Sequence, residues 1–265
     1  MYDVPDPKTE NHPDPAACHC FLICSGRLLR YEGDGDSVTV PDTVRAVAGE
    51  VFRGLRGLGE AFLPDGLLSI GESAFTDCRA LSHIRIPDSL IRIGARAFRR
   101  CSCLPEITLP DGFEYIGEYA FEDCLSLRRV TLPGSLRRIC GYAFFRCCSL
   151  AEIELPEGLK RLGTAAFAHS GLRRAAAPGT LTELPECAFF CCDGLREFTA
   201  APGLRTIGEN AFAYCRSLKT VTLPASVETI APSAFLACGA LTVRAPENSR
   251  AARFARAHGI PLQIL

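Results

Sequence analysis

The amino-acid sequence repeats with a period of 23 residues, and this period constrains the fold more than any other feature. One copy runs from Leu67 to Pro87 and contains an Ala-Phe pair that ends at Phe75. Equivalent phenylalanines are 23 residues apart, except for one step of 22 between Phe167 and Phe189. A period of this length is typical of a solenoid, in which each repeat contacts only its neighbours. The sequence therefore predicts one elongated α/β repeat domain of nine coils. The marker phenylalanines are Phe52, Phe75, Phe98, Phe121, Phe144, Phe167, Phe189, Phe212 and Phe235.

Apolar columns indicate which side chains face the core. Positions eight and five residues before each marker phenylalanine are apolar in every coil, and the position six residues after it is apolar in all but one. The segment from Leu81 to Ile86 alternates apolar and polar residues and ends at Pro87, which cannot donate a ladder hydrogen bond, so it is a predicted strand. Stacked coils would place these strands about 4.8 Å apart in a parallel sheet. The segment from Gly71 to Phe75 is predicted to form a short helical turn opposite that sheet.

The ends of the chain differ from the repeats. Residues 1–20 are rich in proline and acidic residues and are predicted to be disordered. The rest is predicted to form a single domain, with a β-hairpin cap over 21–40, nine repeats over 41–246, and a capping helix and tail over 247–265. In that helix Arg250, Arg253 and Arg256 are expected to be solvated, and a binding role is the alternative for them.

Charge and hydropathy exclude several classes of partner. The chain has 29 basic and 30 acidic residues and a formal net charge of −1, so it lacks the field that gathers nucleic acid or anionic lipid. No apolar run approaches the roughly 18 residues that a membrane helix needs. Met1 is followed by polar residues and proline, which does not match a secretory leader. We therefore expect neither nucleic-acid binding nor a membrane span.

The repeat unit Leu-x-x-Ile-Gly-x-x-Ala-Phe-x-x-Cys-x-x-Leu-x-x-Ile-x-Ile-Pro resembles the BspA-type leucine-rich repeat family, and the resemblance covers nearly everything from Phe21 to Leu265. It implies a right-handed coil with the parallel sheet on its concave face, hairpin and helical caps, and a bacterial protein that binds proteins. Members of the family are often surface-exposed or secreted and associated with adhesion, which favours a surface location here. The absence of a leader and the many thiols favour the cytoplasm instead.

Fifteen cysteines would suggest disulfides or metal in a small secreted protein. Seven of them follow a marker phenylalanine by three residues, which predicts a column of small buried groups that remain reduced. The seven are Cys78, Cys101, Cys124, Cys147, Cys192, Cys215 and Cys238. The one cluster that resembles metal ligands is His12, Cys18, His19, Cys20 and Cys24, but its spacing matches no standard zinc module. No cysteine has an evident histidine base, so neither a catalytic site nor a cofactor is predicted.

Two surfaces are candidates for protein binding. Residues that face outward from the predicted strands are polar and mixed in sign, and simple cross-strand pairing is the alternative explanation for them. They include His83, Arg85, Glu106, Arg129, Glu152 and Glu154. Aromatic residues around the predicted turns could form an exposed patch together with Cys148 and Cys191, or could fold back to cover local gaps. These aromatic residues are Tyr119, Tyr142, Phe145, Phe190 and Tyr214.

These features predict a non-catalytic protein-binding scaffold. A structural or self-assembling spacer is the alternative, and the oligomeric state is left open. The sixth coil, which follows Phe167, departs from the pattern because it is one residue short and has Arg173 in the leucine column, with Leu172 one place early. Its strand positions are occupied by the small Ala175 and Ala177. We therefore expect a bend or a discontinuity in the sheet at this coil, with lower local stability.

Overall fold

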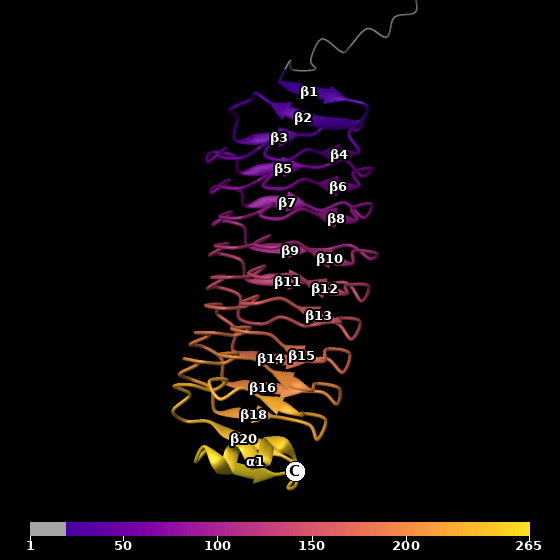
Figure 1. Cartoon of the computed structure of the whole chain (residues 1–265). Helices are drawn as coiled ribbons and strands as arrows, with labels where there is room; N and C mark the ends of the chain where they lie inside the picture. The colour runs from indigo at the N-terminus through magenta and orange to yellow at the C-terminus, as the bar shows by residue number, and fades with distance from the viewer. Residues whose placement is uncertain (1–19) are drawn as a thin grey trace, which may run out of the picture.

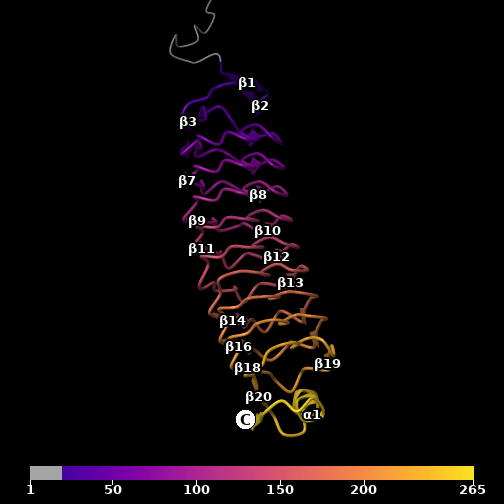
Figure 2. The same ribbon diagram turned by 90° about the vertical axis from the view of Figure 1, so that its left-hand side faces the viewer.

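Each repeat folds into one coil, and all but one of the coils contribute a short strand to each of two parallel ladders. The computed structural model describes residues 20–265, and Figures 1 and 2 show the coils stacked one above another along the length of the molecule. Because the strands of successive coils pair in register at the repeat spacing, every apolar column continues through the stack. The leucine-rich repeat solenoid is thus confirmed, and its core runs between the two ladders.

Ladder 1 contains the strands predicted from the alternating segment that ends at proline. Its strands are β3 (Ser37–Thr39), β5 (Glu60–Phe62), β7 (His83–Arg85), β9 (Glu106–Thr108), β11 (Arg129–Thr131), β14 (Arg174–Ala177), β16 (Glu197–Ala200), β18 (Thr220–Thr222), β20 (Thr242–Ala245) and β21 (Leu262–Ile264). Hydrogen bonding divides this ladder into three sheets, which are β3-β5-β7, β9-β11 and β14-β16-β18-β20-β21.

Ladder 2 begins at the N-terminal hairpin and continues through strands of two residues. Its strands are β1 (Phe21–Cys24), β2 (Arg27–Tyr31), β4 (Ala46–Val47), β6 (Ser69–Ile70), β8 (Arg92–Ile93), β10 (Tyr115–Ile116), β12 (Arg138–Ile139), β13 (Arg161–Leu162), β15 (Glu183–Leu184), β17 (Thr206–Ile207) and β19 (Thr229–Ile230). The hairpin pair β1-β2 is antiparallel and the later pairs are parallel. One sheet reaches from β1 to β13 and a second contains β15, β17 and β19.

The marker phenylalanines form a single stack through the middle of the core. Centroids of successive rings are 4.8 to 5.6 Å apart, and the ring planes differ by 1 to 19°. Tyr31 of β2 contacts Phe52 at one end of the stack, with 5.3 Å between centroids. Phe254 of α1 (Arg250–Ala257) lies edge-on to Phe235 at the other end, at 6.0 Å. The hairpin and the helix therefore cap the core as predicted.

The column of seven cysteines packs beside this stack, and all seven thiols are free. Each thiol donates a hydrogen bond to the backbone carbonyl of a marker phenylalanine in the preceding coil, with Sγ to O distances of 3.0 to 3.2 Å. Cysteine suits this position because it is small and apolar and still offers one weak donor. Ser170 takes the place of the thiol in the sixth coil and lies 3.3 Å from Cys192 Sγ.

Native alkylation should separate these buried thiols from the exposed ones. Burial raises the pKa of Cys78 to about 12 and that of Cys238 to about 11. At pH 8 the reactive thiolate of Cys78 should therefore be scarcer than that of an ordinary thiol by on the order of a thousandfold. We expect iodoacetamide to label the exposed Cys103 and Cys148 in minutes and the column cysteines only after unfolding, as read by peptide mass spectrometry. Disulfides within the column would contradict this prediction.

The predicted short helical turns are wrong, because α1 is the only helix in residues 20–265. Each regular coil instead makes two tight turns, and the third residue of each turn is left-handed, as a type II turn requires. In the second coil these residues are Ser73 (φ 56°) and Asp77 (φ 62°). A left-handed residue every fourth position prevents a helix from continuing. The Phe75 N–H bonds the Ala97 carbonyl of the next coil at 2.8 Å, so these turns also join the stack.

The predicted discontinuity lies at the entry to the sixth coil. Residues 151–155 form no strand between β11 and β14, and ladder 2 is interrupted between β13 and β15. The coil is shortened by one residue in the turn at Gly171. The backbone there passes so close to the preceding coil that a Cβ atom on residue 171 would lie 2.1 Å from the Cys148 carbonyl oxygen. Leu172 is fully buried and Arg173 is exposed, so the leucine shifts to fill the core site. Ladder 1 has a second interruption, between β7 and β9, which the sequence analysis did not predict.

Candidate protein-binding surface

Six aromatic side chains from five successive coils form a continuous row on the turn side of the solenoid. The first two rings stack with their centroids 4.8 Å apart. Each later ring meets the next edge-on, with centroids 5.4 to 5.7 Å apart. We call this row the aromatic ribbon, and it consists of Tyr119, Tyr142, Phe145, His169, Phe190 and Tyr214. The structure thus brings together all five aromatic residues predicted from the sequence.

His169 joins the two halves of the ribbon, and the sequence analysis missed it. It lies two residues after Phe167, which is the position that Tyr214 occupies in its own coil. The residue that would stack between Phe145 and Phe190 is Ala168, which is small and buried, so the imidazole spans the gap between the two phenyl rings. Comparison with the column of Tyr214 is the sequence signal that could have identified it.

The ribbon is accessible to solvent. Tyr119, Tyr142, Phe145 and Phe190 are half-buried, His169 is exposed, and 39% of Tyr214 is exposed. These rings do not belong to the buried core, which is filled by the phenylalanine stack. They therefore do more than fill gaps between core side chains. A row of half-buried rings is an apolar surface that a partner can cover.

Four ring-bearing residues of the ribbon occupy left-handed backbone positions. These residues are Tyr119 (φ 57°), Tyr142 (φ 58°), His169 (φ 58°) and Tyr214 (φ 61°). Glycine, asparagine and aspartate tolerate this conformation best, and Gly54, Asp77, Asp123 and Asn210 stand in the same two columns. Larger residues such as Arg96, Arg100 and Arg146 also occupy these columns, so the stacked coils hold bulky side chains in this conformation outside the ribbon as well.

Charged residues border the ribbon on its N-terminal side. The guanidinium carbon of Arg96 lies 5.1 Å from the centroid of the Tyr119 ring, as a cation–π contact requires. Beyond it, Arg100 lies between Asp77 and Asp123 at 3.7 and 3.8 Å, and Arg146 approaches Asp123 at 3.3 Å. An apolar centre with a polar margin is the usual composition of a protein-binding surface.

Three thiols lie beside the ribbon. Cys148 Sγ is 3.8 Å from the His169 carbonyl oxygen. Burial raises the pKa of Cys187 and of Cys191, with nearby acidic residues adding to the effect. Both thiols are therefore protonated at neutral pH, which makes them contact groups and poor nucleophiles. Cys148 and Cys191 were predicted here from the sequence, and Cys187 was not.

The outward face of ladder 1 is a separate surface in which most charges are paired. Glu106 lies 3.7 Å from Arg129 on the next strand, and Arg85 lies 3.4 Å from Asp65. The His83 ring is tilted against Phe62, with 5.9 Å between centroids. These contacts agree with the alternative of cross-strand pairing. Glu152 and Glu154 line an open cavity of about 350 Å³ at the interruption before β14, with Arg174 and Glu197 on its far side, 3.7 Å apart.

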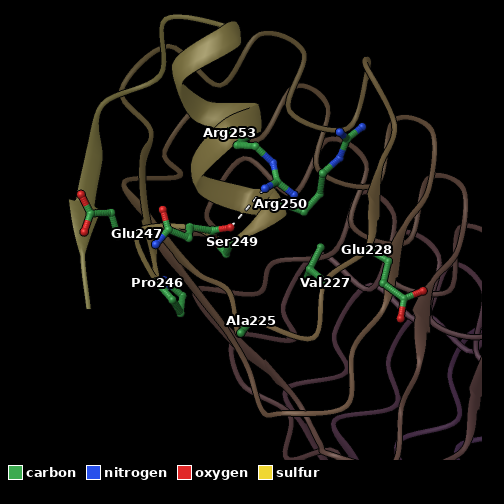
Figure 3. Close-up of a pocket in the computed structure, with 9 residues that line it drawn as sticks. Ala225, Val227, Glu228, Pro246, Glu247, Ser249, Arg250 and Arg253 are labelled. Carbon is green, nitrogen blue, oxygen red and sulfur yellow. Dashed lines mark hydrogen bonds between the residues drawn. The ribbon is translucent and has the colours of Figure 1, made fainter.

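Another open cavity lies at the C-terminal end, where α1 leaves the last coil. Figure 3 shows Arg250 and Arg253 above Ala225 and Val227, and the cavity has a volume of about 610 Å³. Ser249 caps the helix by accepting a hydrogen bond from the Ala252 N–H at 3.1 Å. Glu228 and Glu247 also line the cavity, and the Glu228 carboxylate pairs with Arg205 of the preceding coil. Arg250, Arg253 and Arg256 are exposed to solvent, as predicted.

Within residues 20–265, no group of three or more His, Cys, Asp or Glu side chains is placed to hold a metal ion. His12, Cys18 and His19 of the cysteine-rich cluster lie outside the described residues, as does most of the segment predicted to be disordered. In the same described part, no helix is long and apolar enough to cross a lipid bilayer.

Comparison with known proteins settles the family. The model of the BspA-type leucine-rich repeat region matches in six copies over residues 31–147 and 114–242. The chain belongs to this family. The matched residues extend from the end of the hairpin to β20 and therefore include the aromatic ribbon and both ladders. Among curated proteins, none matches the sequence.

Two solved structures illustrate the likeness. A leucine-rich cell surface protein from Faecalibacterium prausnitzii is 20% identical, with 92% of each chain covered and a TM-score of 0.54, and this likeness shows the fold. The Treponema pallidum leucine-rich repeat protein is 28% identical over 72% of this chain and 82% of its own, with a TM-score of 0.51. Both are bacterial repeat proteins, in agreement with the family.

Proposed function

We propose that this BspA-type repeat protein is a non-catalytic scaffold that binds another protein through the aromatic ribbon. The ribbon itself carries the proposal, because its six rings are in continuous contact and accessible to solvent. Tyrosine and phenylalanine contribute large contact areas and are enriched in the buried centres of interfaces. The rigid stack beneath the ribbon holds the rings in place before a partner arrives, which lowers the entropic cost of binding.

A bacterial adhesion or host-protein contact is the finer form of this proposal. The cell surface protein from Faecalibacterium prausnitzii shares the fold, and a repeat scaffold with an exposed aromatic surface suits such a role. Either a surface location or a cytoplasmic one is compatible with the ribbon. A spacer that assembles with copies of itself is the alternative, since the same rings could contact a second copy of the chain.

The double substitution Phe145→Ser and Phe190→Ser tests the ribbon. Both rings are half-buried on the outer side of the core, so we expect the melting temperature to change little. Loss of two central anchors should weaken binding to a protein partner by up to roughly a thousandfold, because each anchor of this type contributes about 2 kcal/mol. Biolayer interferometry against a panel of purified host and bacterial surface proteins would provide the partner, and light scattering would detect self-association.

The matched control is Ile91→Ser, which removes an apolar side chain that is 60% exposed outside the ribbon. It should leave both the affinity and the association state unchanged. Equal affinity of the double variant and the original protein for a bound partner would reject the ribbon as the contact surface. Conversion of an oligomer to a monomer by the double variant alone would favour the self-assembling alternative.

A further inference from the structure

The interruption of ladder 2 leaves two backbone donors without their usual acceptor. In the coil before it, the N–H groups of Lys160 and Arg161 both bond the Arg137 carbonyl, at 2.9 and 3.2 Å. The coil after it repeats the pattern, with two N–H groups bonded to the Thr182 carbonyl at 2.8 and 3.1 Å. The equivalent N–H groups of Thr182 and Glu183 make no such bond to the Lys160 carbonyl.

Pro185 removes one donor at this opening. In most other coils a glycine or another residue at this position donates its N–H to the preceding coil, as Gly163 does to Ile139 at 2.8 Å and Gly208 does to Leu184 at 2.8 Å, although Gly117 makes no such bond and β8 and β10 still pair there. Proline has no N–H, so the Leu162 carbonyl loses its donor. The coil also follows the one-residue deletion, which changes the offset to its neighbour from 23 to 22 residues.

The same opening is surrounded by positive charge that the protein does not neutralise. Arg138 of β12 and Arg161 of β13 are register partners, so their side chains emerge side by side, and Lys160 precedes Arg161. Like charges on adjacent strands are destabilising unless an anion lies between them. None of these three groups forms an ion pair in the described structure, and the Arg138 guanidinium carbon lies 5.8 Å from the centroid of the Tyr115 ring. Ladder 1 differs, because opposite charges alternate on its adjacent strands, as in the pair Glu106 and Arg129.

These groups meet at one open cavity of about 450 Å³. The cationic side chains of Arg138, Lys160 and Arg161 line one wall, and Thr182 and Glu183 line the other. Leu162 and Gly163 complete the lining. The carboxylate of Glu183 is the single negative group among the lining residues, so three cationic groups and one anionic group surround the cavity. Two free backbone N–H groups beside guanidinium groups form the donor set that binds oxyanions elsewhere in proteins.

We propose that this cavity binds a multiply charged oxyanion, the shared chemistry of phosphate and sulfate groups. Guanidinium forks match the oxygen geometry of such groups, and Lys160 adds a point charge that can approach them from the rim. The anion would separate the like charges of Arg138 and Arg161 and accept the N–H bonds that Pro185 leaves open. The site lies on the ladder 2 face and does not depend on the aromatic ribbon or on the proposed scaffold function.

Isothermal titration of the full chain with inorganic phosphate, and separately with sulfate, tests the site. Arg161→Gln should weaken binding by about tenfold, the loss expected for one charge-assisted contact. The matched control is Arg92→Gln, which removes an exposed arginine in the same column of an ordinary coil, where its register partner is the neutral Ser69. It should leave the affinity unchanged. No measurable binding, or equal loss in the two variants, would overturn the proposal.

A second variant tests whether binding requires the open ladder in addition to the cationic side chains. Pro185→Gly restores an N–H for the Leu162 carbonyl and keeps every cationic side chain, so ladder 2 should close and oxyanion affinity should fall by about tenfold or more. Circular dichroism would confirm that the variant is folded. Affinity equal to that of the original protein would show that the opening is not the site. Titrations with a phosphomonoester and a sulfate monoester then identify the preferred source, and tighter binding of either supports the site.

Discussion

Replacing Phe144 by alanine is expected to lower the free energy of unfolding by about 3–5 kcal/mol. The ring lies in the middle of the phenylalanine stack and is fully buried, with centroids 5.4 Å from both Phe121 and Phe167. Alanine would remove both contacts and leave a void that the neighbouring coils cannot fill, because backbone hydrogen bonds on the turn side and in the ladders fix their spacing. Urea unfolding followed by circular dichroism would measure the loss as a lower transition midpoint.

The substitution Phe235→Ala is the matched control for this position in the stack. Phe235 stacks on one neighbour only, has Phe254 edge-on to it, and is 7% exposed, so the C-terminal helix can move to reduce the void. We expect a smaller loss of stability than for Phe144→Ala. Equal losses in the two variants would show that stability does not depend on a continuous stack.

The fold was largely predictable because the period places the same residue type at the same depth in every coil. Columns that are apolar throughout, such as the one containing Leu67 and Leu90, are fully buried in the structure. Neighbouring coils support one another only when their apolar residues are in phase, so the repeat itself encodes the stacking. Even the short sixth coil obeys this rule, since Leu172 takes the core site and Arg173 turns outward.

The turns were mispredicted because their local sequence matches a helix start. Glycine, an acidic residue and an Ala-Phe pair are compatible with a helical turn, but the observed turns need a left-handed residue such as Ser73 or Asp77. Arg96, Tyr142 and Cys187 occupy the same conformation, and none of these residues indicates it from sequence. The stacked neighbours impose it by accepting backbone bonds from one coil to the next. Tertiary context therefore overrides local propensity in these turns.

The candidate surface was predictable only in part for a similar reason. Tyr119 and Tyr142 share a column, so their stacking follows from the period. The column shared with Tyr214 could have placed His169 on the same side of the solenoid, but its contacts with both Phe145 and Phe190 also depend on the small, buried Ala168. The opening in ladder 2 coincides with the missing N–H of Pro185 and with the one-residue deletion before it. Neither feature alters the apolar pattern enough to show where a ladder ends.

Amide hydrogen exchange should reveal that opening as a local loss of protection. The N–H groups of Thr182 and Glu183 have no bond to the preceding coil, whereas those of Arg137 and Arg138 bond the Glu114 carbonyl at 2.9 and 3.1 Å. We expect the first pair to exchange faster than the second by roughly a hundredfold or more, because exchange of bonded amides requires the coils to separate. Peptides from 171–185 should likewise exchange faster than those from 124–139. Mass spectrometry with peptide resolution measures both comparisons.

The other side of the same strand distinguishes a local opening from a weak coil. Arg205 and Thr206 donate to the Thr182 carbonyl at 2.8 and 3.1 Å, so their protection depends on the contact between the seventh and eighth coils, which contain Phe189 and Phe212. If only the interruption before β15 is open, these two amides stay protected while Thr182 and Glu183 exchange fast. If the whole coil that contains Thr182 is unstable, both pairs exchange fast together. Equal protection of Thr182, Glu183, Arg137 and Arg138 would contradict the opening itself. An amide without a hydrogen bond at a broken ladder should not be as well protected as an amide that is bonded in an intact ladder.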